Sequence, residues 1–519
     1  MPFNAGADLG PPRERSAVIS DHVDVLIVGA GLSGIGMACR LLRECPGTTF
    51  AILEARPSTG GTWDVFRYPG VRSDSDMMTL SYDFRPWTGA AMVADGAAIL
   101  DYLRETAQIY GLPPHIRFGR RAVAASWSSD DARWTVRVRD EDTGEYSVVT
   151  CSFLSACTGY YRLDRGWTPD FAGTADFIGP IIHPQTWPTG LTVADRRVAV
   201  IGSGATAMSM VPALAAAGAR VTLVQRSPTW VAALPSRDPV ATMLRRLPDR
   251  PARQLLRWRN IGMSVLIYQL SRRAPRVLAT VLRAAARRHL PTATIDAHFT
   301  PDYRPWDQRL CLVPDGDLLD LVDTGAVTMV TDTVEAFDRT GLRLGSGAHI
   351  DADIVVTATG LELLTLGGMT LEVDSRPIDP ADTVTYLGML LSGVPNFALT
   401  VGYTNASWTL KSDLVAGFVC RLWRYLQQHA YSTVVADAPA LRPGDELRPM
   451  FDLQSGYLLR SRHLLPRQGP RAPWRLRQNY PLDRWLVRHG RITRGLRFSP
   501  AAPTGTDQRR RGTDNATTN

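Results

Sequence analysis

The sequence is poor in cysteine and has no C-x-x-C pair. Its six cysteines are Cys39, Cys45, Cys151, Cys157, Cys311 and Cys420. This spacing excludes the redox cysteine pair of a thiol–disulfide reductase and is typical of a reducing cytoplasm. The nine histidines show no metal-ligand spacing, so we expect no structural or catalytic metal ion.

Long hydrophobic runs are also missing. None approaches the ~18–20 apolar residues that cross a bilayer, and the start, MPFNAGADLGPPRERSAVIS, contains no hydrophobic signal core. We therefore expect a cytoplasmic protein. A chain of 519 residues is too long for one hydrophobic core, so we expect two or three domains.

Lysine is almost absent, because Lys411 is the only one in the chain. A lysine in so arginine-rich a sequence either occupies a place where a guanidinium does not fit or is there by chance, and the sequence leaves both open. The net charge of +8 is unevenly spread, since arginine dominates between about 241 and 290 and again in the tail that ends DQRRRGTDNATTN.

These basic segments allow three interpretations. We favour solvated helices that line a pocket, and the second interpretation is peripheral contact with an anionic membrane at its inner face. Nucleic acid is the third, and we expect none because no nucleic-acid fold signature accompanies the charge.

A strand, a glycine-rich turn and an amphipathic helix follow one another in DVLIVGAGLSGIGMACRLL, residues 24–42. Gly29, Gly31 and Gly34 form G-x-G-x-x-G, whose glycines allow a tight turn, backbone approach to a pyrophosphate and close packing of helix on strand. Ser33 lies at the helix start, where phosphates bind. Glu54 ends the next strand, where a carboxylate takes a ribose hydroxyl pair. The segment therefore predicts a dinucleotide with a free ribose.

The pattern recurs in RRVAVIGSGATAMSMVPALAAAG, residues 196–218, where Gly202 and Gly204 are followed by Ala207 in the third slot. The next strand ends in Gln225-Arg226-Ser227 and lacks the acid. A carboxylate there would repel a 2′-phosphate, whereas Arg226 can bind it through charge-assisted hydrogen bonds. We therefore predict FAD at the first site and NADPH at the second.

Two further strand patterns, CSFLSACTGYY (151–161) and DADIVVTATGL (351–361), each end in Thr-Gly. We interpret them as the crossings by which the chain leaves the FAD domain and later returns. The predicted fold is α/β with two Rossmann-like dinucleotide-binding domains, the NADP domain being inserted in the FAD domain and carrying a helical subdomain. The expected parts are a flexible tail (1–20), the FAD domain (21–160 and 351–500), the NADP domain (161–235 and 301–350), a helical insertion (236–300) and a disordered basic tail (501–519).

Two motifs narrow the chemistry: GGTWDVFRYPGVRSD at 60–74, and FIGPIIHPQTWP at 177–188, which follows F-x-G-x3-H-x3-W-P. With the two glycine motifs, RPWDQRLCLVP and VGYTNASWTLKSDL, they make roughly residues 21–500 resemble the Baeyer–Villiger monooxygenases, class B flavoproteins that use FAD, NADPH and oxygen. The resemblance is closest to the subgroup that contains the ethionamide-activating monooxygenase. Related N- and S-oxygenating enzymes usually lack the Trp187-Pro188 ending, which favours ketone oxygenation.

The resemblance implies roles for single residues. Arg309 would stabilise a peroxide anion, with Arg304 as a rival that the spacing after Pro305-Trp306 disfavours. Asp74 would hold and tune Arg309, and His183 would help the nicotinamide to change position. The candidate cofactor-binding residues are Gly29, Gly31, Ser33, Gly34, Glu54, Gly61, Thr62, Trp63, Asp64, Val65, Arg72, Ser73, Asp74, Ala122, Gly202, Ser203, Gly204, Ala205, Thr206, Ala207, Arg226 and Ser227.

The implied reaction begins with hydride transfer from NADPH to the flavin. The C4a-peroxyflavin formed with oxygen then converts apolar ketones to esters or lactones and, when protonated, oxygenates sulfides or thioamides. Residues 403–426 are expected to point a helix N-terminus at the flavin. The 236–300 helices, with Trp230, Trp258 and Tyr268, are expected to wall the substrate pocket, although ordinary helix packing explains them equally well. An S/N-oxygenating flavin monooxygenase and a membrane-surface redox-sensing flavoprotein are the alternatives.

Overall fold

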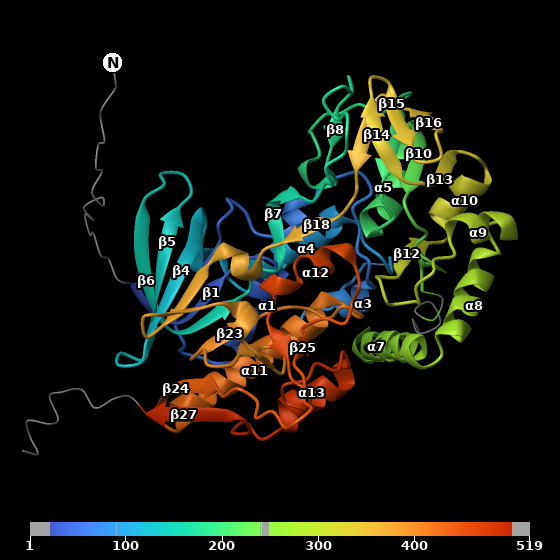
Figure 1. Cartoon of the computed structure of the whole chain (residues 1–519). Helices are drawn as coiled ribbons and strands as arrows, with labels where there is room; N and C mark the ends of the chain where they lie inside the picture. Colours follow the sequence, from blue (N-terminus) through green and yellow to red (C-terminus); the bar gives the residue numbers. More distant parts are fainter. Residues whose placement is uncertain (1–20, 90, 239, 241–248, 501–519) are drawn as a thin grey trace, which may run out of the picture.

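Two sheets organise the computed structural model, which describes residues 21–89, 91–238, 240 and 249–500 (Figure 1). The two predicted tails, 1–20 and 501–519, lie outside the described residues. The first sheet runs, in order, β20 (Arg376–Ile378), β19 (Thr370–Val373), β4 (Arg120–Ser128), β5 (Arg133–Asp140), β6 (Tyr146–Ala156), β1 (Asp21–Val28), β2 (Phe50–Leu53) and β3 (Ile116–Arg117), with β23 (Phe397–Leu399) beside β6. The second runs β13 (Val327–Thr331), β10 (Arg220–Gln225), β9 (Arg197–Ile201), β17 (Ile354–Thr357) and β8 (Ile181–Ile182).

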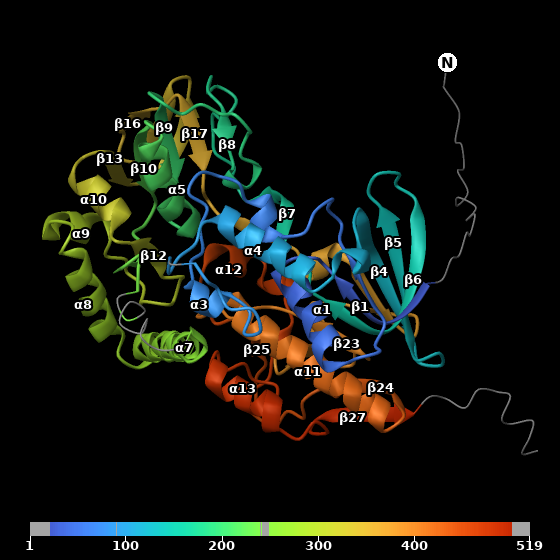
Figure 2. The ribbon, with the colours of Figure 1, turned by 180° about the vertical axis from the view of Figure 1, so that it is seen from behind.

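The first sheet is parallel at its centre, where β1 lies between β2 and β6. The apolar strand β1 is buried on both faces, as strands of central parallel sheets are. Val25 and Ile27 pack against three helices, α1 (Leu32–Glu44), α4 (Gly96–Ile109) and α11 (Trp408–Gln428), which cover one face (Figure 2). Leu26 points to the opposite face of the sheet, where it packs in a second core together with residues of the antiparallel strands β4 and β5.

The second sheet is entirely parallel, with α5 (Ala205–Ala216) and α10 (Asp317–Asp323) packed in its core and a small antiparallel sheet of β14 (Val334–Asp338), β15 (Gly341–Leu344) and β16 (His349–Asp351) beside it. The strand β17 pairs with β9 in this sheet. The expectation that the chain rejoins the FAD part at 351 is therefore wrong, because 354–357 still belongs to the second sheet.

The two crossings between the sheets lie side by side. After β6 the chain forms β7 (Tyr161–Gly166), and after β17 it forms β18 (Leu361–Leu363), which pairs antiparallel with β7. This two-stranded ribbon, which we call the crossing ribbon, carries both covalent connections between the parts that hold the two sheets (Figure 1).

The remaining elements cover these sheets. The helical insertion contains α7 (Asp249–Arg273), α8 (Pro275–Ala286) and α9 (Thr292–His298), between the paired strands β11 (Val231–Leu234) and β12 (Cys311–Pro314). The other elements are α2 (Thr62–Val65), α3 (Met77–Leu80), α12 (Gly456–Arg460), α13 (Tyr480–His489), β21 (Thr385–Tyr386), β22 (Leu390–Leu391), β24 (Tyr431–Ala436), β25 (Arg448–Pro449), β26 (Arg467–Gln468), β27 (Leu496–Pro500) and short 3-10 turns at 113–115, 184–186, 365–368, 380–382 and 462–464. None of the described helices is long and apolar enough to cross a membrane.

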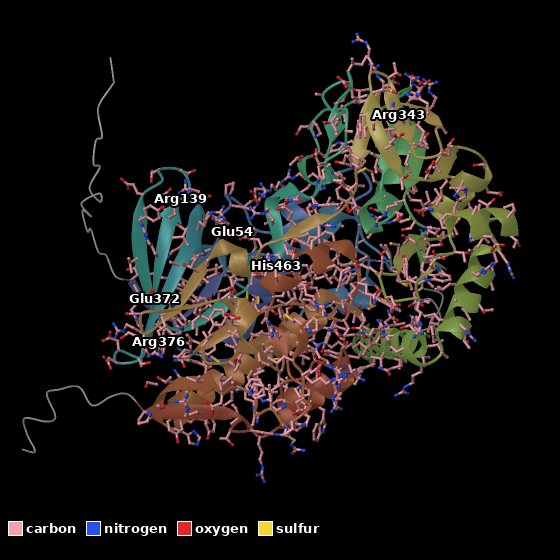
Figure 3. All side chains as sticks on the ribbon, in the orientation of Figure 1. Glu54, Arg139, Arg343, Glu372, Arg376 and His463 are labelled. Atoms are coloured by element: carbon pink, nitrogen blue, oxygen red, sulfur yellow. The ribbon has the colours of Figure 1, made fainter. Side chains whose placement is uncertain are left out.

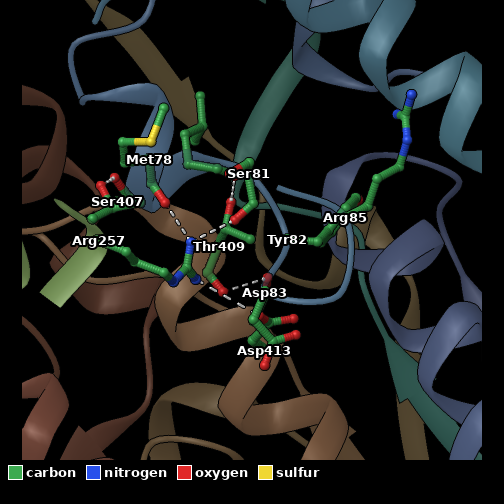
Figure 4. A network of polar contacts seen from close by, with 12 residues as sticks. Met78, Ser81, Tyr82, Asp83, Arg85, Arg257, Ser407, Thr409 and Asp413 are labelled. Carbon is green, nitrogen blue, oxygen red and sulfur yellow. Dashed lines mark hydrogen bonds and ion pairs between the residues drawn. The ribbon is translucent and has the colours of Figure 1, made fainter. Parts of the chain in front are cut away.

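A buried polar network joins the helical insertion to the first part of the molecule (Figure 4). Arg257 of α7 donates hydrogen bonds to the backbone oxygens of Met78 (2.5 Å) and Ser81 (2.9 Å). Its Nη2 lies 4.0 Å from Oδ2 of Asp413 on α11. Burial raises the pKa of Asp413 to about 7, and Asp83 contributes in the same direction. The interior of the protein therefore holds a carboxyl group that favours its neutral form.

This shifted pKa predicts a pH-dependent stability. An unfolded aspartate titrates near pH ~3.9, so the folded protein binds more protons than the unfolded chain between that pH and about 7. The contribution of Asp413 to the free energy of unfolding is therefore greatest below the unfolded pKa and falls as the pH rises through the folded pKa, by at most ~1.4 kcal/mol per pH unit. Asp413→Asn should remove this slope and make the protein more stable than wild type at pH ~8. Urea unfolding at several pH values checks this.

The exposed Asp323→Asn, at the end of α10, is the matched control and should keep the wild-type slope. An Asp413→Asn protein whose stability changes with pH as steeply as that of wild type would show that Asp413 titrates normally.

Candidate active site

The first glycine loop leaves no room for side chains at two of its glycines. Gly29 has φ +103°, and a Cβ there would lie 2.7 Å from the Cys157 carbonyl oxygen. A Cβ on Gly34 would lie 1.8 Å from the oxygen of Gly29, so only glycine lets α1 pack this closely on β1. At Gly31 the Cα of Gly61 would be the nearest atom, at 3.5 Å. Two stretches of bare backbone therefore face each other at the start of α1.

Glu54 is held rigidly at the end of β2. One carboxylate oxygen accepts the backbone N–H of Ala30 (2.7 Å) and the other accepts that of Arg56 (2.9 Å). Burial raises the pKa of Glu54, while these hydrogen bonds oppose the shift. Glu54 is buried, with 6% of its surface exposed, and Figure 3 labels it near the middle of the view, whereas Arg343 on β15 lies near the upper end. The carboxylate lines the main cavity next to the glycine loop.

Asp64 does not line this cavity, although its motif suggested a contact with a cofactor. Its carboxylate is buried and accepts hydrogen bonds from Arg56 (2.7 Å), Arg67 (2.9 Å) and Arg104 (3.0 Å). The pKa of Asp64 is lowered, because hydrogen bonds from Ser58 and Arg56 outweigh its burial. Asp64 therefore fixes the turn after Gly61, and the neighbouring Trp63 is the side chain that reaches the cavity.

The second glycine loop repeats the geometry of the first. Gly202 has φ +129°, and a Cβ there would lie 2.2 Å from the Ala358 carbonyl oxygen. Gly204 has no atom near the position of a Cβ, and Ala207 is fully buried against the sheet. Arg226 and Ser227 follow β10 and line the cavity beside this loop. An arginine thus lies where the predicted 2′-phosphate would bind.

One cavity of about 1270 Å³ connects both loops, somewhat larger than pockets for single small ligands, which span about 300–1,000 Å³. The predicted site residues that line it are Gly29, Gly31, Ser33, Glu54, Gly61, Thr62, Trp63, Arg72, Ser73, Asp74, Ala122, Gly202, Ser203, Gly204, Ala205, Thr206, Arg226, Ser227 and Arg309. Those that do not line it are Gly34, Asp64, Val65, His183 and Ala207.

Arg309 and Asp74 form an ion pair in this cavity. Arg309 precedes β12, and its Nη1 donates to Oδ2 of Asp74, which ends the RYPGVRSD segment. The Asp74 carboxylate raises the pKa of Arg309 well above its ordinary value. The rival residue, Arg304, does not line the cavity, and its backbone N–H donates to Asp307 (3.2 Å). Of the two candidate arginines, Arg309 is therefore the one that lines the cavity.

His183 lies beside the crossing ribbon, next to a small neighbouring pocket. Its Nε2 lies 2.9 Å from the carbonyl oxygen of Gly360, and its Nδ1 accepts the backbone N–H of Gln185 at 3.2 Å. One donor and one acceptor on the ring match a neutral imidazole with its proton on Nε2, and burial lowers the pKa of His183. His183 is thus a neutral link between the second crossing and the segment before β9, and its part in turnover remains a prediction.

Gly166 at the end of β7 makes room for this ring, because a Cβ there would lie 1.8 Å from the His183 Cε1. We expect Gly166→Ala to lower the free energy of unfolding by about 1–3 kcal/mol through overpacking. Gly166→Ala combined with His183→Ala should cost less than the sum of the single changes, because the clash disappears. Urea unfolding of the four proteins tests this.

Gly262 of α7, whose Cβ would meet no atom within 4 Å, provides the control substitution. Gly262→Ala should leave stability unchanged or raise it slightly. Strictly additive effects of Gly166→Ala and His183→Ala would contradict the close contact.

The cavity also contains residues that the sequence interpretation missed. Tyr160, Tyr161, Tyr457 and Arg460 line it, and the Arg460 guanidinium lies 3.5 Å from the ring centroid of Trp167. Only Tyr160 and Tyr161 had a sequence signal, since they follow the Thr-Gly of the first crossing.

The predicted wall of the substrate pocket is not observed, because none of the described residues between 236 and 300 lines the cavity. Trp230 is instead buried and donates to the Tyr303 oxygen (2.8 Å), and Trp258 is exposed.

Comparisons with known proteins identify the family of the chain. The model of the flavin-binding monooxygenase-like family matches residues 71–245, and that of an NAD(P)-binding Rossmann-like domain matches residues 27–88. The chain is 50% identical over 494 residues to the FAD-containing monooxygenase EthA of Mycobacterium tuberculosis, covering 94% of this chain and 100% of EthA. It is 43% identical to the probable FAD-binding monooxygenase AlmA of Acinetobacter baylyi, covering 92% and 95% of the two chains.

Among solved structures, an oxidized steroid monooxygenase bound to NADP superposes with a TM-score of 0.72 at 23% identity, covering 92% of this chain and 99% of its own. An ε-caprolactone-bound cyclohexanone monooxygenase gives 0.69 at 19% identity, covering 92% and 100%. These two likenesses confirm the predicted fold. The resemblance inferred from the motifs is confirmed at the level of the family, and the chain belongs to the flavin-binding monooxygenase-like family.

Proposed function

We propose that this protein is an NADPH- and oxygen-dependent FAD monooxygenase of the Baeyer–Villiger type. It converts apolar ketones to esters or lactones and also oxygenates sulfides or thioamides. The observation that carries the proposal is the Arg309–Asp74 ion pair in the cavity that connects the two glycine loops. A guanidinium fixed by a carboxylate offers a preorganised positive charge for an anion that develops nearby.

The described residues fit the two dinucleotides. The bare backbone of Gly31 and Gly61 leaves space at the start of α1 for a pyrophosphate, and Glu54 lies beside it for a ribose. Arg226 lines the cavity beside the second glycine loop, and its guanidinium could bind a 2′-phosphate there. When bound at this loop, FAD would supply the redox and oxygen-activating chemistry. The names of the relatives EthA and AlmA, as FAD-containing and FAD-binding monooxygenases, support the same cofactor.

The protein itself would bind, orient and shield the reactants. Arg309 would hold negative charge, while Asp74 keeps its guanidinium in place. Leu361, Leu364 and Leu366 line the cavity with apolar surface that suits an alkyl chain. The lactone bound in the cyclohexanone monooxygenase structure is the product class expected from a cyclic ketone.

A product assay tests the proposal. Purified holoenzyme, NADPH and oxygen with 2-octanone should give an ester, with about one NADPH used per ester formed. Oxidation of a sulfide without any reaction of ketones would favour the S/N-oxygenating alternative. NADPH consumption that yields only hydrogen peroxide would point to an oxidase or a redox sensor.

We also propose peripheral contact between α7 and an anionic membrane. The outward face of α7 is apolar, with exposed fractions of 54% at Leu255, 43% at Trp258, 50% at Met263 and 60% at Leu266. Exposed arginines accompany it, including Arg273 at its end and Arg276 at the start of α8. Apolar side chains flanked by arginine are typical of helices that lie in the surface of an anionic bilayer.

This contact predicts salt-sensitive binding to lipid. We expect the protein to pellet with phosphatidylglycerol vesicles and Leu255→Ser/Leu266→Ser to lose most of this binding, because the buried apolar area falls. Ile109→Ser removes an equally exposed apolar side chain at the end of α4 and should change nothing. Equal binding of all three proteins would remove α7 from the contact.

A further inference from the structure

The middle of α7 holds the segment that follows Asp74. Asn260 donates a hydrogen bond from its side-chain nitrogen to Oδ1 of Asp76 at 2.8 Å, and Asp76 is the N-cap of α3. Arg257, one turn earlier on α7, binds two backbone oxygens of the same segment (Figure 4). The chain is therefore fixed to α7 two residues after Asp74.

The end of the same helix holds the turn that leads to Arg309. Arg272 donates from Nη1 to Oδ1 of Asp307 at 2.8 Å and from Nη2 to the backbone oxygen of Trp306 at 2.7 Å. Its guanidinium also lies over the ring of Tyr268, 5.5 Å from the ring centroid, which orients it. One side chain of α7 thus binds two successive residues of the turn, and Arg309 follows two residues later.

This turn has a backbone conformation that its surroundings must maintain. Residues 304–307 form a β-turn, closed by the hydrogen bond from the Asp307 N–H to the Arg304 oxygen at 3.0 Å. Its third residue, Trp306, has φ +67°, a value that favours glycine and is strained for tryptophan. Strained backbone persists only where neighbouring groups hold it, and it gathers at functional sites. The guanidinium from α7 supplies this hold, together with the backbone N–H of Gln454, which donates to the Asp307 oxygen at 2.6 Å.

We propose that Asn260 and Arg272 are positioning residues, which set the distance between Asp74 and Arg309. They lie on one continuous helix, about 18 Å apart along its axis. The helix α7 is thus a rigid spacer between the segment that carries the carboxylate and the turn that leads to the guanidinium, two groups from residues 235 positions apart. This inference rests on the proposed function, since it names the element that assembles the proposed anion-stabilising pair.

Steady-state kinetics of the holoenzyme with 2-octanone test the positioning. Arg272→Met should lower kcat for ester formation about 10- to 100-fold, because a misplaced catalytic group loses its alignment. The KM for NADPH should change by less than about threefold, and Arg272→Lys, which can still bind the Asp307 carboxylate, should recover part of the loss. In Arg309→Ala the residual rate should fall no further when Arg272→Met is added, because the guanidinium through which it acts is gone. Arg283→Met removes a comparable ion pair, with Asp296, from the same helical insertion and should keep the wild-type kcat.

Crystal structures of wild type and Arg272→Met test the positioning without turnover. In the variant the turn 304–307 should be displaced and the ion pair between Arg309 and Asp74 should be lost. Asn260→Leu is a second, independent variant, which frees the segment on the other side of the pair. It should also separate the pair and lower kcat without a large change in the KM for NADPH.

Three results would overturn the inference. The first is an unchanged ion pair in both variants, and the second is an equal loss of kcat from Arg272→Met with and without Arg309. The third is a similar loss of kcat in Arg283→Met, which would show that any damage to the insertion has this effect. A wild-type protein that makes no ester would contradict the Baeyer–Villiger proposal alone, because the crystal structures still decide whether α7 positions the pair.

Discussion

Replacement of Arg309 by alanine should abolish ester formation while FAD stays bound. The guanidinium is paired with Asp74 in the cavity, and Arg309 is not part of the glycine loop of α1 that is proposed to hold FAD. Removal of a preorganised charge that stabilises a developing anion typically costs on the order of 10²–10³-fold in kcat. The measurement is the rate of ester formation from 2-octanone, together with the flavin content of the purified protein.

Arg304→Ala is the control, because this arginine is five positions away in the sequence but does not line the cavity. It should keep nearly full activity. Asp74→Asn should give an intermediate loss, since the guanidinium remains while its ionic partner is gone. An Arg309→Ala enzyme that still makes ester at nearly the wild-type rate would show that the anion is stabilised elsewhere.

Arg226→Ala should change which nicotinamide cofactor the enzyme uses. A charge-assisted hydrogen-bonded pair with a phosphate contributes about 1.5–3 kcal/mol, so the KM for NADPH should rise roughly 10- to 100-fold. NADH has no 2′-phosphate, and its KM should change by less than about threefold. Steady-state oxidation of both cofactors measures the difference.

Arg220 provides a control on the same strand. It begins β10, at the end away from Arg226, and donates to the backbone oxygen of Asp195 at 2.9 Å. Arg220→Ala should leave both KM values unchanged. A similar rise of the NADPH and NADH values in Arg226→Ala would remove the arginine from the 2′-phosphate site.

The sequence predicted the parts of the site that local patterns determine. Gly29 and Gly202 were recognisable because a strand, a tight turn and a helix must follow one another around a dinucleotide, and each indeed has a positive φ that favours glycine. The role of Arg309 could be predicted only from a family motif. Its ion pair joins residues 235 positions apart, which no local pattern reveals.

The rest depended on tertiary packing. Tyr457 reaches the cavity because α12 packs on β18, a contact between segments far apart in the sequence. Asp64 stands in the GGTW motif beside cavity residues, yet its carboxylate pairs with the nearby Arg56 and Arg67 and with Arg104 of α4, and it does not line the cavity. The helices of 236–300 have an apolar pattern that suits a pocket wall, but α7 presents apolar residues outward and contacts α3 and α11 through Arg257.

The crossing ribbon has a consequence for how the molecule can move. Both connections between the two sheets run through β7 and β18, and His183 ties the start of β18 to the segment before β9. A two-stranded ribbon twists readily about its own axis, whereas stretching it would break its backbone hydrogen bonds. We therefore expect the part that carries the second sheet to rotate as a rigid body about the crossing ribbon. This rotation would change the distance between the two glycine loops without changing the fold of either part.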